Sequence, residues 1–147
     1  MKKLTVLSYV TGALLMFIGL GAAAAGYGLM TDPSGAGVGL PLDLLRNSPF
    51  TDFLIPGIAL FLINGVASLI GALLAFKKNP FTGIITLTLG IAMVIWIGAQ
   101  VSWIGWESWL QPTFLALGLI EIALGFLLMD EYINQGKFGW HRKPHAH

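Results

Sequence analysis

The stretch that decides the fold is Thr113-Phe-Leu-Ala-Leu-Gly-Leu-Ile-Glu-Ile-Ala-Leu-Gly-Phe-Leu-Leu-Met129, which is apolar except for Thr113 at its edge and Glu121 near its centre. A transmembrane helix needs about 20 mainly apolar residues to cross about 30 Å of hydrocarbon. This stretch reaches that length if the helix continues to residue 131. A charge at mid-membrane depth costs at least about 2.5 kcal/mol on insertion, so ionisable residues there usually face a partner, a cavity or a substrate path.

Three further stretches of the chain have the same character. We therefore predict four membrane-spanning helices, at about residues 4–30, 53–76, 81–99 and 113–131. The composition agrees, because 56% of the 147 residues are hydrophobic and 10% are charged, against about 25% charged residues in soluble domains. The predicted fold class is an all-α integral membrane four-helix bundle, a single domain over residues 1–147 with a cytoplasmic tail at 132–147.

The positive charges are unevenly divided between the two sides of this predicted bundle. Seven of the eight Lys and Arg residues lie at the N-terminus, between the second and third helices or in the tail, and only Arg46 lies elsewhere. Cytoplasmic segments carry an excess of these residues. We therefore predict cytoplasmic termini and two extracytoplasmic loops, at 31–52 and 100–111. The first apolar run exceeds the 7–15 residues of a signal peptide, so we expect it to be retained.

Glycines recur every seven residues in three of the four predicted helices. They are Gly12, Gly19 and Gly26 in the first helix, Gly83 and Gly90 in the third, and Gly118 and Gly125 in the fourth. Seven residues are close to two helical turns, so each set lies along one face. Because close contact at small residues helps to hold helices together in lipid, we predict that these faces point into the bundle.

Glu121 shares the glycine face of its helix, and polar residues of two other helices are predicted to point toward it. The predicted intramembrane polar site consists of Glu121, Asn64, Ser68 and Thr86. Counted from the predicted helix ends at 1.5 Å per residue, Asn64 and Glu121 differ in depth by only about 5 Å. No Lys or Arg lies within the four spans, so we expect the Glu121 carboxyl group to be uncharged.

Three interpretations of this polar site remain open. The four residues form interhelical hydrogen bonds that hold the bundle together, or Glu121 binds a proton, a cation or a substrate, or its carboxyl group faces a partner subunit.

A second group of candidates lies in the predicted outer loops. We expect Pro56 to kink the start of the second helix. The favoured interpretation is that the preceding loop packs over the bundle, and the alternative is a small outward pocket lined by Asp52 and Arg46. In the other loop, tryptophans recur every three residues, which is typical of the membrane–water interface. Stacking of a sugar, a quinone or a lipid ring is the alternative. The outer-face candidates are Asp52, Arg46, Gln100, Trp103, Trp106, Glu107 and Trp109.

Three loop motifs carry a resemblance. They are Asp32-Pro-Ser-Gly35 with Leu40-Pro41, Ser48-Pro-Phe-Thr-Asp-Phe-Leu-Ile-Pro-Gly57, and Ser108-Trp-Leu-Gln-Pro112. With these motifs the chain resembles a group of small, uncharacterised four-span membrane proteins of bacteria. The resemblance implies a multi-pass protein of the bacterial inner membrane and implies no particular activity.

Several sequence motifs of known enzyme and cofactor-binding classes are missing from the chain. The chain has no cysteine, and it has no phosphate loop, dinucleotide fingerprint, zinc-protease motif or nucleophile elbow. The three histidines of the tail are interpreted as part of a solvated segment. We therefore predict no catalytic residue, no cofactor, no metal site and no nucleic-acid partner.

Three functions stay open for a protein that lies in the lipid bilayer. The favoured one is an accessory or structural protein that binds another membrane protein or lipid. The first alternative is an oligomeric small transporter or channel, in which Glu121 serves proton or cation passage. The second is an enzyme or cofactor binder at the outer face. Whether the chain forms a homo-oligomer or binds another membrane protein is likewise open.

Overall fold

The structure, a computed structural model, describes residues 2–38, 41–106 and 110–134. All regular elements in these residues are helical, and four segments are long and apolar enough to cross a membrane. The long segments are built from α1 (Lys2–Thr31), α2 (Leu54–Ala59), η3 (Leu60–Val66), α3 (Ala67–Phe76), α4 (Thr82–Ile104) and α5 (Leu110–Asn134). Two short 3-10 helices, η1 (Ala36–Val38) and η2 (Leu42–Leu45), follow α1.

The elements α2, η3 and α3 together form one continuous helix, called the second span below. Its middle part, η3, is a π-helix, so the N–H group of Ala67 donates to the carbonyl of Leu62, five residues back. The buried Asn64 lies in this part. Short π-helical segments are rare and are frequent at functional sites. The second span is therefore locally irregular at its one amide side chain.

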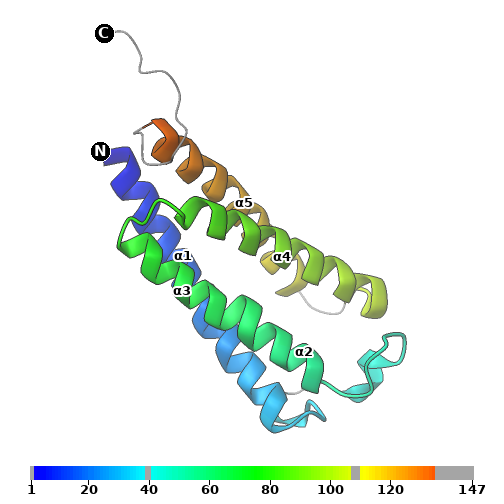
Figure 1. Ribbon diagram of the computed structural model, residues 1–147. Helices are drawn as coiled ribbons and strands as arrows, with labels where there is room; N and C mark the ends of the chain where they lie inside the picture. Colours follow the sequence, from blue (N-terminus) through cyan, green and yellow to red (C-terminus); the bar gives the residue numbers. More distant parts are fainter. Residues whose placement is uncertain (1, 39–40, 107–109, 135–147) are drawn as a thin grey trace, which may run out of the picture.

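The four spans form two antiparallel hairpins (Figure 1). In one hairpin α1 packs along the second span, and in the other α4 packs along α5. The hairpins meet through buried apolar clusters, one of which contains Leu15 of α1 and Leu89 of α4, and another Leu4 of α1 and Leu128 of α5. The start of α1 and the end of α5 lie at one end of the bundle, here called the terminal end. The opposite end is called the loop end.

A tight turn between α3 and α4 reverses the chain at the terminal end. Lys78 takes a left-handed conformation there, with φ of 54°. The N–H group of Asn79 donates to the carbonyl of Leu74 over 2.9 Å, which closes the end of α3. The Asn79 side chain then accepts the N–H group of Phe81 at 2.9 Å, just before α4 begins. These hydrogen bonds direct α4 back along the bundle.

The glycine faces lie inside the two hairpins. A Cβ atom at Gly26 would come within 2.7 Å of the backbone nitrogen of Phe61 in the second span. A Cβ atom at Gly90 would come within 2.7 Å of the Gly118 carbonyl oxygen. Both distances are shorter than van der Waals contact, so any side chain would force the helices apart. The prediction that these glycines point into the bundle is confirmed.

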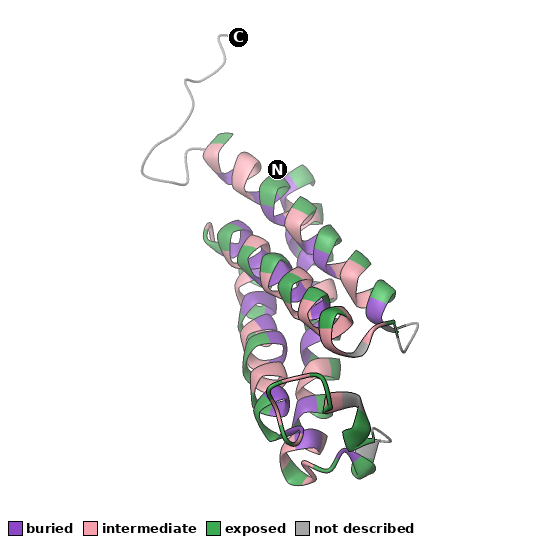
Figure 2. Cartoon of the chain, turned by 90° about the vertical axis from the view of Figure 1, so that its right-hand side faces the viewer, coloured by how far each residue is buried: buried purple, intermediate pink, exposed green. Residues whose placement is uncertain are grey.

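The outward faces of the bundle are rich in large apolar side chains. Figure 2 shows buried positions on the inward side of the helices and exposed positions on the outward side. Phe17, Ile95 and Phe126 are all more than half exposed and come from three different helices. Soluble proteins rarely expose contiguous apolar surface of this kind. An apolar surface around a helical bundle is what contact with lipid hydrocarbon requires.

Two helices extend further than the sequence predicted. α4 continues to Ile104 instead of stopping near residue 99, and it ends at Gly105, whose φ is 73°. The predicted loop at 100–111 is therefore partly helical at both of its ends. α5 covers Leu110–Asn134 instead of 113–131, because polar residues beyond the apolar run continue the helix. The first residues of the predicted tail thus belong to α5, and residues 135–147 lie outside the described residues.

The orientation of the bundle in a membrane stays a prediction from the positive charges. The chain has no cysteine, so single cysteines report on individual sites. We expect Ser34→Cys, at the loop end, to react with an impermeant thiol reagent in intact cells. Asn79→Cys, at the terminal end, should react only after the cells are permeabilised. The reverse labelling pattern would contradict cytoplasmic termini.

Candidate functional site

Glu121 lies in the seam between α4 and α5. Glu121 lies between Gly118 and Gly125 on the face of α5 that points toward α4, and it is only 1% exposed. Gly90 of α4 lies directly opposite, since a Cβ atom placed there would be 2.9 Å from the Cβ atom of Glu121. The carboxyl group therefore enters the bundle at the level where α4 has no side chain.

Neither carboxyl oxygen of Glu121 has a hydrogen-bond partner among the described residues, although both oxygens are fully buried. A buried polar group without a partner costs about 1–3 kcal/mol. An interhelical hydrogen bond to another protein group is thus not what keeps Glu121 in place. This observation disfavours the first of the three interpretations of the polar site.

Thr86 lies on the same seam as Glu121. It sits on α4 between Gly83 and Gly90, three residues from one and four from the other, so it shares their face toward α5. The residue is completely buried, and its hydroxyl group has no hydrogen-bond partner among the described residues. Of the predicted polar site, Thr86 and Glu121 lie on the same α4–α5 seam, about one helical turn apart.

Asn64 does not lie at the depth of Glu121 in the bundle, which corrects the predicted difference in depth between the two residues. Gly65, next to Asn64, packs against Ala23 of α1, whereas Leu89, next to Gly90, packs against Leu15 of α1. Ala23 and Leu15 are eight residues apart, which is about 12 Å along the helix.

Asn64 is therefore nearer the loop end than Glu121 by about 12 Å rather than 5 Å. The prediction failed because the helix ends were assumed to be level. Ser68 is one helical turn from Asn64 toward the terminal end and is also buried, so these two polar residues share one face of the second span.

Two polar residues of α1 were missed by the sequence analysis. Ser8 and Thr11 are completely buried, and the Thr11 hydroxyl group has no hydrogen-bond partner among the described residues. They lie on one face with Leu4, Leu15 and Ile18, at spacings of four, three, four and three. This spacing is readable in the sequence, but the glycines were taken to mark the only inward face of that helix.

Thr11 lies close to the depth of Thr86. Leu15 of α1 packs against Leu89 of α4, and the two threonines precede these leucines by four and three residues. The helices α1 and α4 run in the same direction, because both begin toward the terminal end (Figure 1). Thr11 and Thr86 therefore lie near one level of the bundle, about one helical turn from Glu121 toward the terminal end.

The outer-face candidates do not form one site. Arg46 pairs with Asp43 at 3.2 Å and both are largely exposed, while Asp52 accepts the backbone N–H of Leu54 at 3.0 Å. The ring of Trp103 packs edge-on against Phe50. Asp52 and Arg46 thus have separate local partners. These contacts give no support to the predicted pocket between the two side chains.

The remaining outer-face candidates divide in the same way. The Gln111 amide group donates to the Gly105 carbonyl at 3.1 Å and to the Gln100 side chain at 3.5 Å. Trp106 is 61% exposed. Glu107 and Trp109 lie outside the described residues. Gln100 therefore joins the ends of α4 and α5.

The loop after α1 is shaped by a carboxylate that the sequence analysis did not single out. Asp32 accepts hydrogen bonds from the Ser34 hydroxyl group at 2.6 Å and from the Gly37 N–H at 3.0 Å. The Ser34 hydrogen bond, aided by backbone N–H groups, lowers the pKa of Asp32 despite partial desolvation. These contacts hold the turn and indicate no ligand.

Comparison with known proteins adds no assignment to this site: no family model, no curated protein and no solved structure matches the chain.

Proposed function

We propose that the protein is a small transporter or channel of the bacterial inner membrane, in which Glu121 is the site that binds and releases a proton. The observation that carries this proposal is the position of Glu121: it is buried in the α4–α5 seam, with neither oxygen hydrogen-bonded to a described protein group. Ionisable groups at such depth are costly and typically mark ion or substrate paths.

A proton fits the site better than a multivalent cation. Calcium takes six to eight oxygen ligands, and the described residues contain no group of three or more His, Cys, Asp or Glu side chains that would hold a metal ion. A single carboxyl group with neighbouring hydroxyl groups is enough to hold one proton. The site also lies within one chain, so enclosing Glu121 requires no second subunit.

An accessory or structural function remains the second candidate. It was favoured because glycine faces left open by the bundle would dock another membrane protein. The glycine faces of α1, α4 and α5 are covered within the chain, so they no longer argue for such docking. The apolar outer surface is compatible with a partner but suits lipid equally well.

The protonation of Glu121 can be followed directly by infrared spectroscopy of the protein in lipid nanodiscs. We expect a protonated carboxyl band that is lost reversibly when the pH is raised and that is missing in Glu121→Gln. Asp43→Asn, which removes an exposed carboxylate in the loop, should keep the band. If Glu121→Gln and the wild type give the same pH-dependent spectrum, Glu121 does not exchange a proton and the proposal is wrong.

A further inference from the structure

Two buried threonines leave their hydroxyl groups unused within their own helices. Serine and threonine in a helix commonly donate to the carbonyl four residues back, as Thr88 does to Ile84 at 2.9 Å. Thr11 and Thr86 make no such bond, although both are completely buried. Their oxygens are therefore available to another hydrogen-bonding group inside the bundle.

These hydroxyl groups continue from Glu121 toward the terminal end. Ser8 follows Thr11 after three residues, a rise of about 4.5 Å, and is buried on the same face. Tyr132 of α5 is completely buried and packs in one cluster with Leu4 of α1, which precedes Ser8 by four residues. From Glu121 to Tyr132 is eleven residues of α5, or about 16 Å. Polar groups thus recur at roughly one-turn steps between the buried carboxyl group and the end of the bundle.

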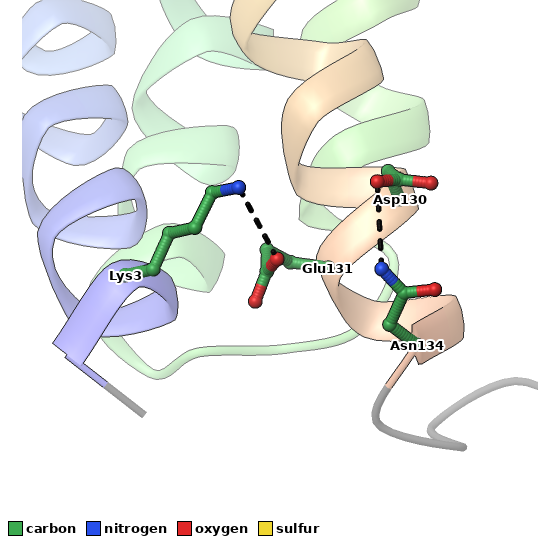
Figure 3. A network of polar contacts seen from close by, with 4 residues as sticks. All are labelled: Lys3, Asp130, Glu131 and Asn134. Atoms are coloured by element: carbon green, nitrogen blue, oxygen red, sulfur yellow. Dashed lines mark hydrogen bonds and ion pairs between the residues drawn. The ribbon is translucent and has the colours of Figure 1, made fainter. Parts of the chain in front are cut away.

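An ion pair lies where this series reaches the surface. The Lys3 ammonium group of α1 and the Glu131 carboxylate of α5 are 3.6 Å apart (Figure 3). Lys3 is mainly exposed and Glu131 mostly covered. Asn134, one turn further along α5, donates to Asp130 at 3.5 Å. Charged groups that exchange protons with water therefore adjoin Tyr132.

The loop side of Glu121 is different. Ile18, Met93 and Ile97 form a buried apolar cluster there, with Phe114 and Leu115 packed against it. Among the described residues, no buried side-chain oxygen without a hydrogen-bond partner lies beyond this cluster. On the loop side of Glu121 the interface of α1, α4 and α5 is therefore apolar at this cluster, and passage across the membrane along this interface requires the cluster to open.

We infer that a line of internal water molecules, held by Thr86, Thr11 and Ser8, connects Glu121 to the terminal end of the bundle beside Tyr132 and the Lys3–Glu131 pair. A buried water typically makes about three hydrogen bonds to otherwise unsatisfied polar groups. Two hydrogen bonds through one water span about 5.5 Å, which matches the one-turn steps. The inference rests on the proposed function, since it describes how the proton reaches Glu121.

No other ionisable group within the spans competes for this role near Glu121. The second span and α4 contain no ionisable side chain. On α1, Tyr9 and Tyr27 are exposed on the outward side. The groups that face the series are Tyr132, Lys3 and Glu131, all toward the terminal end.

The test is the rate at which Glu121 gains and loses its proton after a pH jump, followed by its infrared band in nanodiscs. Thr11→Val and Thr86→Val remove the hydroxyl groups with little change in shape. We expect each to slow the exchange about tenfold, the effect of one hydrogen bond of usual net strength. Thr88→Val is the matched control, because that hydroxyl group bonds to its own helix, and it should exchange at the wild-type rate.

A second measurement keeps the inference testable if a valine variant fails to fold. A high-resolution structure of the wild type in lipid should show ordered water within hydrogen-bond distance of Thr11 and Thr86. Wild-type exchange rates in both folded valine variants, or absence of water at these hydroxyl groups, would overturn the inference while leaving proton binding intact. A Glu121 band that ignores pH in the wild type would instead refute the proposed function, whether or not the water is present.

Discussion

Replacing Gly125 with leucine is expected to lower the melting temperature of the purified protein by roughly 3–10 °C, the equivalent of 1–3 kcal/mol of overpacking in a chain of this size. A Cβ atom at this position would lie 2.6 Å from the backbone nitrogen of Leu87 and 2.8 Å from the Gly83 carbonyl oxygen. Both are backbone atoms, so α4 and α5 can relieve the clash only by moving apart. Differential scanning fluorimetry in detergent measures the effect.

Gly98→Leu provides the matched control for this substitution. Gly98 lies on α4, and a Cβ atom there would meet nothing within 4 Å, so the same change should leave the melting temperature near that of the wild type. If Gly125→Leu melts no earlier than Gly98→Leu, α4 and α5 do not pack through their glycines as described. The position of Glu121 in that seam would then also be wrong.

The sequence predicted the four long apolar helices and their inward glycine faces well, because both follow from local patterns. Four apolar runs of sufficient length predict four spans, and glycines seven residues apart predict narrow packing faces. The pairing of these faces was not predictable. Gly26 packs on the second span and Gly90 packs on α5, and this choice depends on the tertiary arrangement of the hairpins.

The candidate site was predicted only in part. Glu121 and Thr86 were found because a polar residue on a glycine face must point into the bundle. Asn64 was placed too close to them, because the register of neighbouring helices follows from side-chain packing rather than from where each helix begins. Thr11 was missed because α1 has two inward faces, one of glycines toward the second span and one of larger residues toward α4 and α5.

Glu121→Gln is expected to separate a proton site from a structural contact. Glutamine keeps the length and shape of the side chain but cannot bind and release a proton at neutral pH. Because no group of the described residues bonds the carboxyl oxygens, we expect the variant to melt within a few degrees of the wild type. A large loss of stability would show that Glu121 holds the bundle together.

The most direct measurement of the central claim is proton flux into liposomes that contain the purified protein and an internal pH-sensitive dye, driven by a potassium diffusion potential. The wild type should acidify the interior faster than protein-free liposomes do, and Glu121→Gln should return the rate to that of protein-free liposomes while remaining folded. Equal flux in the wild type and in folded Glu121→Gln, or no flux above protein-free liposomes in the wild type, would contradict the proposal that Glu121 carries protons.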